Sequence, residues 1–204
     1  MCRNTGLRAL RAALALLLCA SLSACITVKS YVDPALPVVT QSQFTAPSAP
    51  DPVLVLFEFR TKGNANARAT EEMRSRVIAA VAQSHQFGQI GGNAPGAGQL
   101  RLVIDNVPLT DNAAAKGFGT GLTFGLAGSL VTDGYICTAV YTRAGKTTQT
   151  TVKHALHTTV GNKAGPAGLP AKTPAEAANV VVDQLVLNAL KQLAAQGAFV
   201  DSGA

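Results

Sequence analysis

The sequence predicts a two-layer α/β domain of the α+β type, with a mixed or mostly antiparallel sheet and two main helices on one face. Three observations predict it. Two apolar runs, VLVLFEFR at 53–60 and LRLVIDNV at 100–107, have the composition of strands. Two stretches have helical periodicity: one follows the first apolar run, and the other lies near the end of the chain. A threonine- and valine-rich pair of strands at 135–160 surrounds a short turn. Helices with one apolar face pack on a sheet in such two-layer domains.

The first strand and helix follow directly from local pattern. The run at 53–60 contains almost no polar residue, which predicts a strand buried on both faces. Residues 67–84 are expected to form a helix, because apolar side chains recur on one face while charged ones stay outside. That face comprises Met73, Val77, Ala80 and Val81. A short strand at 87–90 and a glycine-rich loop at 91–98 are expected next.

The second half of the predicted sheet is a strand at 100–107 and a hairpin. Residues 135–142 and 147–160 are rich in the strand formers threonine, valine and tyrosine, and they flank Arg143-Ala144-Gly145-Lys146. His154 and His157 lie three positions apart on the second of these strands. Because side chains alternate along a strand, the two rings are expected on opposite faces and not at one metal ion.

The last helix has the clearest start signal. Thr173-Pro174-Ala175-Glu176 is a capping box with proline at the first helical position. The helix is expected to run to the vicinity of Gly197, and its wide apolar face indicates packing on a sheet. The folded domain is therefore assigned to residues 53–197, followed by a tail at 198–204.

The first 24 residues have the layout of a secretory signal peptide. Arg3, Arg8 and Arg11 give a positive start, and the apolar segment ALALLLCASLSA follows. That segment is too short for a transmembrane helix in the mature protein. We therefore assign 1–24 to a signal peptide that is removed after export.

The end of this segment, Leu22-Ser23-Ala24-Cys25, resembles the lipobox of bacterial lipoproteins. The resemblance implies that Cys25 is lipidated and becomes the first residue of the mature protein. It also implies a location, because Ile26 is not the aspartate that retains lipoproteins in the inner membrane. The expected location is the outer membrane, facing the periplasm. The acyl lipid (palmitate) on Cys25 is the one bound group that we expect, and no other cofactor is expected.

Cysteine count and charge are consistent with this assignment. Cys2 and Cys19 leave with the signal peptide and Cys25 carries lipid, so Cys137 has no partner for an intrachain disulfide. Removing three arginines and no acidic residue lowers the formal charge from +6 to +3. The remaining basic residues are scattered, which argues against nucleic-acid binding.

Residues 25–52 are assigned to the lipid anchor and a tether. The stretch 26–52 holds five of the ten prolines and is expected to be mostly unstructured. A flexible chain of this length would reach about 28 Å.

An apolar, glycine-rich insert at 113–131 separates the strand at 100–107 from the hairpin. No charge occurs from Gly117 to Val131, and small residues recur at spacing four. As a helix this pattern is a glycine zipper, which lets a second helix approach closely. A helix of fifteen residues would rise about 22 Å, short of the hydrocarbon core of about 30 Å. Spacing four is also compatible with a strand, so periodicity leaves helix and strand open. The residues expected to contact a membrane or another copy are Gly117, Phe118, Gly121, Leu122, Gly125, Leu126 and Ser129.

The sequence offers no catalytic constellation, and we expect neither an enzyme nor a metal site. Gly145-Lys146-Thr147 lacks the upstream glycine of a phosphate loop. Asp105 and Asp133 are the acidic residues with apolar neighbours, and Asp133-Gly134 is more typical of a turn or bulge. Cys137 is typical of a small buried hydrophobe.

The mature chain as a whole resembles uncharacterised bacterial outer-membrane lipoproteins with a small α/β domain. It is more distantly similar to the curli-secretion lipoprotein, whose α/β domain bears membrane-spanning inserts and forms a ring. The shared features are the lipobox at Cys25, the strands at 53–60 and 100–107, the insert and the closing helix. Together with the missing catalytic set, they lead us to expect a lipid-anchored periplasmic module that binds other envelope components or has a structural role. The alternative is an oligomeric, membrane-inserting component of an export or envelope-assembly machine.

Overall fold

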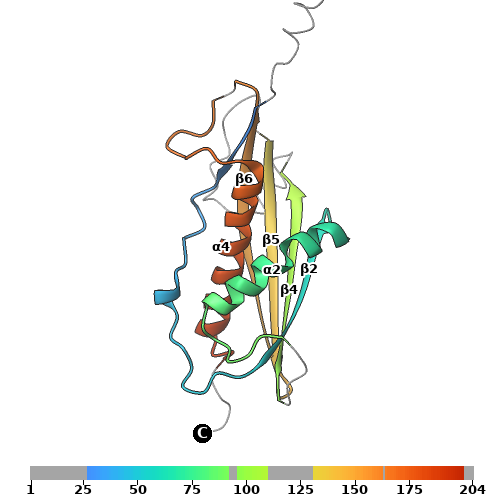
Figure 1. Ribbon diagram of the computed structural model, residues 1–204, viewed down its shortest axis with the longest axis vertical. Coiled ribbons are helices and arrows are strands. Elements are labelled where there is room, and N and C mark those ends of the chain that lie inside the picture. Colours follow the sequence, from blue (N-terminus) through green and yellow to red (C-terminus); the bar gives the residue numbers. More distant parts are fainter. Residues whose placement is uncertain (1–26, 92–95, 110–130, 163, 200–204) are drawn as a thin grey trace, which may run out of the picture.

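The computed structural model describes residues 27–91, 96–109, 131–162 and 164–199. These residues form a six-stranded mixed sheet with two helices packed on one face, and the sheet is not closed into a barrel (Figure 1). The predicted fold class is therefore confirmed. The elements are β1 (Val28–Val32), the 3-10 helix η1 (Gln41–Gln43), β2 (Val53–Thr61), β3 (Asn64–Ala65), α2 (Ala67–Gln83), β4 (Gly98–Pro108), β5 (Val131–Arg143), β6 (Lys146–Val160) and α4 (Pro174–Ala195).

The strand order is β1-β6-β5-β4-β2-β3. β2 and β4 are parallel and are connected through α2, whereas β4–β5, β5–β6 and β1–β6 are antiparallel. The β5–β6 hairpin closes through Ala144 and Gly145, both of which have positive φ (48° and 78°). This is the conformation of a two-residue hairpin turn whose twist matches that of the strands. The turn confirms that the Gly145-Lys146-Thr147 sequence is not part of a phosphate loop.

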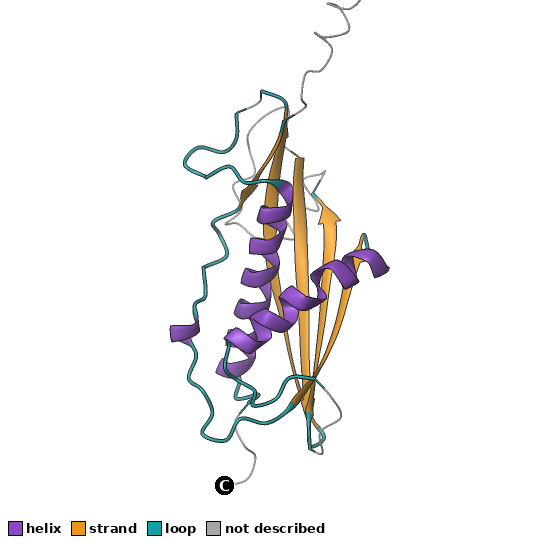
Figure 2. Cartoon of the chain, viewed as in Figure 1, coloured by secondary structure: helices purple, strands orange, loops and turns teal. Residues whose placement is uncertain are grey.

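The core lies between the sheet and the two helices (Figure 2). Alternate side chains of each central strand point into it, as alternation along a strand requires. They are Val53, Val55, Phe57 and Phe59 from β2; Leu100, Leu102 and Ile104 from β4; and Tyr135, Cys137, Ala139 and Tyr141 from β5. From α2, the predicted face of Val77, Ala80 and Val81 is buried against them. The predicted apolar face of α2 is thus confirmed, with Met73 partly buried at its edge.

The opposite side of the sheet carries no helix, and we call it the open face. It bears Leu56, Arg101, Thr138 and Lys153, which alternate with the core residues. Leu56 is 40% exposed. The prediction that 53–60 is buried on both faces is therefore wrong, because both helices pack on the same side and leave the second face of β2 uncovered.

Both helices begin with side-chain caps. The Asn66 side chain accepts a hydrogen bond from the Ala69 amide at the start of α2. At the start of α4, Thr173 and Glu176 cap each other reciprocally and Pro174 opens the helix, which confirms the predicted capping box. An ion pair between Arg76 and Asp183 then joins the two helices at 2.5 Å.

Three local predictions differ from the structure. Residues 28–32, expected within an unstructured tether, form the edge strand β1, because tertiary pairing with β6 supplies the hydrogen bonds. Residues 87–90 contribute a single bridge between Val53 and Ile90 in place of a strand. Asp133 and Gly134 continue the regular register of β5, so they form neither a turn nor a bulge.

Among the described residues, no helix combines the length and the apolar character that crossing a membrane requires. The charge-free run at 117–131 enters the described residues with Val131, the first residue of β5.

Candidate functional site

The predicted lipidation residue Cys25 lies outside the described residues, as do all seven predicted contact residues of the insert (Gly117, Phe118, Gly121, Leu122, Gly125, Leu126 and Ser129). Their roles stay predictions. The structure does fix the residues that flank them. Thr27, two positions after Cys25, accepts a hydrogen bond from the Gly161 amide at 2.8 Å. The Leu109 amide bonds to Thr132 at 2.9 Å, which places both flanks of residues 110–130 on neighbouring strands.

A buried chain of three polar side chains connects β1, β5 and β6 on the open face. His157 Nε2 lies 2.9 Å from the Asp33 carboxylate, and His157 Nδ1 lies 3.0 Å from the Thr132 hydroxyl. The three side chains are at most 9% exposed, and His157 is fully buried. Asp33 also accepts a hydrogen bond from the Ala35 amide at 2.8 Å, which fixes the turn after β1.

This chain has the order hydroxyl, imidazole, carboxylate that is known from nucleophilic catalysis. Catalysis also needs a cavity where a substrate meets the hydroxyl, and the pockets beside the end of α4 and beside η1 do not include these residues. The arrangement instead satisfies three buried polar groups at once and ties the edge strand β1 to the sheet. Sequence reasoning missed it, because Asp33 was assigned to the tether.

His154 lies on the other side of β6. Its Nε2 lies 2.5 Å from the amide oxygen of Gln184 on α4, whereas its Nδ1 is buried without a partner. Burial lowers the pKa of His154 below its ordinary value. The two histidines thus occupy opposite faces, as predicted. No group of three metal-ligating side chains occurs among the described residues.

The remaining candidate groups are separated or inert. Asp105 pairs with Ile136 and points to the open face, whereas Asp133 lies three residues before Ile136 and points to the helix side. The two acids therefore share no cleft. Cys137 is fully buried, and burial raises its pKa to about 12. This agrees with its expected role as a buried hydrophobe.

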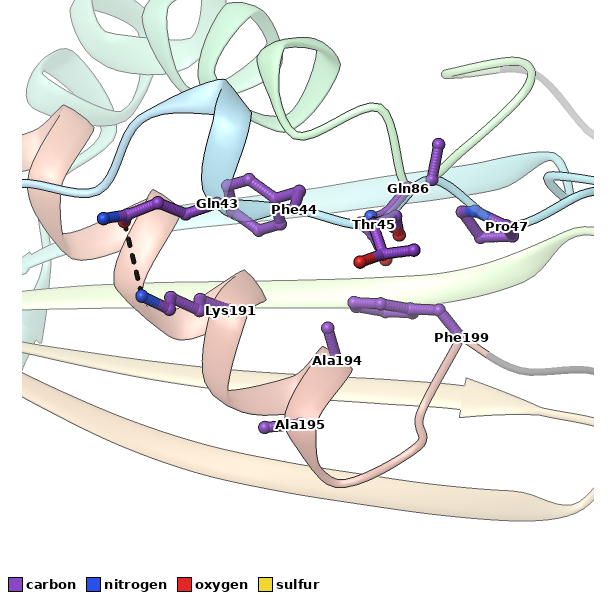
Figure 3. Close-up of a pocket in the computed structure, with 10 residues that line it drawn as sticks. Gln43, Phe44, Thr45, Pro47, Gln86, Lys191, Ala194, Ala195 and Phe199 are labelled. Carbon is purple, nitrogen blue, oxygen red and sulfur yellow. Dashed lines mark hydrogen bonds between the residues drawn. The ribbon is translucent and has the colours of Figure 1, made fainter.

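A concavity of the described structure lies beside the last turns of α4 (Figure 3). It has a volume of about 460 Å³. The segment after η1 forms one wall, and the end of α4 forms the other. The lining residues are Gln43, Phe44, Thr45, Ala46, Pro47, Gln86, Lys191, Ala194, Ala195 and Phe199.

The walls of this pocket are held by specific contacts. The buried Gln86 side-chain amide donates to the Thr45 carbonyl at 3.0 Å, which fixes the segment after η1. The Phe199 ring packs edge-on against Phe87 and Tyr141, with centroids 5.0 and 5.1 Å apart. The pocket is therefore preformed and has an aromatic wall.

One cationic group lies at the rim. The Lys191 ammonium donates to the Gln43 amide oxygen at 3.3 Å, as the dashed line in Figure 3 shows. An apolar pocket with a few polar groups at its rim is the usual form of a small binding site. Here it suits an apolar group that carries an anionic or hydrogen-bond-accepting end.

No protein-family model and no curated protein matches the chain. Among solved structures, it is similar to the PelC dodecamer from Paraburkholderia phytofirmans, with 15% identity, 82% of this chain and 96% of that chain covered, and a TM-score of 0.27. It is also similar to a DUF330 protein from Xanthomonas campestris, with 12% identity, 75% and 91% covered, and a TM-score of 0.30. An uncharacterised protein has 9% identity, 76% and 99% coverage and a TM-score of 0.35. These similarities are too distant to transfer a function, so the function is inferred from the residues of this chain.

Proposed function

We propose that the protein is a lipoprotein of the bacterial outer membrane, held through acylated Cys25, whose folded domain is a non-catalytic binding or structural module in the periplasm. The observation that carries the proposal is Leu22-Ser23-Ala24-Cys25, which stands at the end of an apolar segment with a basic start. A thiol at this position accepts the lipid, and small residues before it admit the signal peptidase.

The domain architecture supports this proposal. The described fold begins at Thr27, so cleavage before Cys25 removes none of its strands or helices. The domain also offers a preformed pocket of about 460 Å³ for a binding role. The buried polar chain that contains Asp33 and His157, by contrast, holds the edge strand β1 to the sheet.

The anchor is tested by replacing the proposed acyl acceptor. We expect Cys25→Ala to abolish metabolic labelling with a palmitate analogue and to leave the protein either soluble or as an uncleaved precursor that keeps residues 1–24. Cys19→Ala is the matched control, because Cys19 lies in the same apolar segment but outside the lipobox. A Cys25→Ala protein that keeps its label and its membrane fractionation would refute the proposal.

The second candidate function, an oligomeric membrane-inserting component of an export or assembly machine, rests on the charge-free run from Gly117 to Val131. Its glycine spacing of four is suited to close packing between copies. This candidate predicts that Gly121→Leu or Gly125→Leu abolishes oligomers while the monomer still folds. A wild-type protein that is monomeric in detergent would contradict it.

A further inference from the structure

The end of the sheet where β1 begins carries an exposed apolar patch. Five large apolar side chains are exposed among the described residues, and three of them lie here. They are Val28, Val131 and Val160, with exposed fractions of 40%, 53% and 50%. We call these three residues the terminal valine patch.

The strand register brings the three valines together. Val28 pairs directly with Val160, and Val131 pairs with Thr158, so Val131 is a diagonal neighbour of Val160. Directly paired side chains lie about 5 Å apart and diagonal ones about 7–8 Å. Alternation along the strands places all three on the side of the sheet that carries the helices. Figure 1 shows that β6 extends beyond the first turn of α4 at this end, which leaves the patch uncovered by the helix.

The connection between β1 and Cys25 is short, and β1 itself is fixed to the sheet. β1 is fixed by its pairing with β6 and, on its outer edge, by two hydrogen bonds of 2.9 Å between the Ser30 and Lys172 backbones. Thr27 is held by the Gly161 amide at 2.8 Å. Val28 lies three positions after Cys25, and a fully extended chain spans about 10 Å over three positions. An acylated Cys25 would therefore hold the patch within about 10 Å of the membrane surface.

We propose that the terminal valine patch contacts the phospholipid bilayer and orients the domain, with the strands of β5 and β6 rising away from the membrane. This inference rests on the proposed acylation of Cys25. The occupant is a lipid surface because the anchor would hold this end of the sheet within about 10 Å of the headgroups. Half-exposed valines at about this depth lie at the boundary between headgroups and acyl chains, where apolar faces of peripheral proteins bury. Lys29 is exposed beside Val28 and suits anionic headgroups.

The chain contains no tryptophan, so a single introduced indole is a unique fluorescent probe. We would reconstitute acylated Val160→Trp protein into vesicles of phosphatidylethanolamine and phosphatidylglycerol that contain brominated lipid. The matched control is Leu56→Trp, since Leu56 is exposed to a similar degree on the open face. Leu56 pairs with Arg101, seven residues from the β4 end, or about 23 Å along the strand.

We expect brominated lipid to quench about half of the Val160→Trp emission and to leave Leu56→Trp unchanged, because the boundary region reaches about 10 Å into the membrane. Val131→Trp is a second probe of the patch and should behave like Val160→Trp. Equal quenching at both ends, or none at either while the protein floats with the vesicles, would overturn the inference and leave the anchor intact. Disulfide-linked dimers of a Val160→Cys variant would also overturn it, because they would show a second copy on the patch. Flotation that survives Cys25→Ala would instead refute the acylation.

Discussion

Removing the Asp33 carboxylate tests whether residues 27–33 belong to the fold or to a tether. The carboxylate bonds to His157, which is fully buried, and to the Ala35 amide. Its loss strands the His157 ring N–H without an acceptor. Leaving a buried donor without its acceptor costs about 1–3 kcal/mol. We therefore expect Asp33→Ala to lower the free energy of unfolding by about this amount, which corresponds to a fall in Tm of about 2–12 °C for a chain of this size.

The assay is urea unfolding of the mature chain, followed by circular dichroism, with two comparisons. Asp33→Asn keeps an oxygen for Ala35 and offers His157 an amide, so it should cost clearly less than Asp33→Ala. Glu72→Ala removes an exposed carboxylate paired with Arg68 on α2, and such pairs contribute below about 1 kcal/mol. If Asp33→Ala costs no more than Glu72→Ala, the buried chain does not hold β1 and the tether interpretation is correct.

Three further predictions follow from the described contacts. Thr173→Ala should lower the free energy of unfolding by about 1 kcal/mol, and Thr173→Asn should restore it, because both threonine and asparagine cap a helix. Thermal unfolding measures the difference. Equal stability of the alanine and asparagine variants would contradict the capping role. Burial lowers the pKa of His154 in the folded state, so the folded protein binds fewer protons than the unfolded chain below the ordinary pKa. The free energy of unfolding should therefore fall as pH drops below about 6.5, by at most about 1.4 kcal/mol per pH unit from this group. In urea titrations at several pH values, His154→Gln should reduce this dependence on pH. If the dependence is the same in His154→Gln and in the wild type, the assignment to His154 is wrong. The Cys137 thiol, with a pKa of about 12, should react with a thiol reagent at neutral pH only after unfolding, and rapid labelling of the folded Cys25→Ala protein would show that the core is open.

The long elements were predictable because their signals are local. The capping box at Thr173 and the strand composition of β4, β5 and β6 depend on neighbouring residues, and the structure confirms both. β1 was missed because it is only five residues long and stands directly before the prolines at 34 and 37. Its hydrogen bonds come from β6, more than a hundred residues later in the chain. Tertiary pairing here overrides local propensity.

The buried polar chain could not be found from sequence for the same reason. Asp33 and His157 are 124 positions apart, and no local motif joins them. Alternation did predict that His154 and His157 point to opposite faces. It could not show which partner each ring meets, because that depends on where β1 and α4 lie against β6. The pocket beside α4 was missed as well, since η1 and Phe199 converge only in three dimensions.

Magnitudes indicate that the terminal valine patch orients the domain and contributes little to its retention. Fully burying a valine is worth about 1.5–3 kcal/mol, so three half-exposed valines offer roughly 2–4 kcal/mol. An acyl chain contributes about 0.8 kcal/mol for each buried CH₂ group, which far exceeds this over a whole chain. Val28→Thr, Val131→Thr and Val160→Thr together should therefore leave flotation unchanged. They should, however, allow the domain to tilt, because the patch holds it upright.

The orientation of the domain sets how far the pocket beside α4 lies from the membrane. α4 begins near the terminal valine patch, and Lys191 lies 18 residues after Thr173, or about 27 Å along the helix. An upright domain therefore presents the Lys191 rim and the Phe199 wall to the periplasm, well above the headgroups, whereas a tilted domain brings them toward the lipid. A water-soluble reagent that modifies Lys191 separates these cases in intact vesicles. The wild type should react fully, and the triple threonine variant should react more slowly while remaining bound. Equal rates for both would show that the anchor alone sets the position of the pocket.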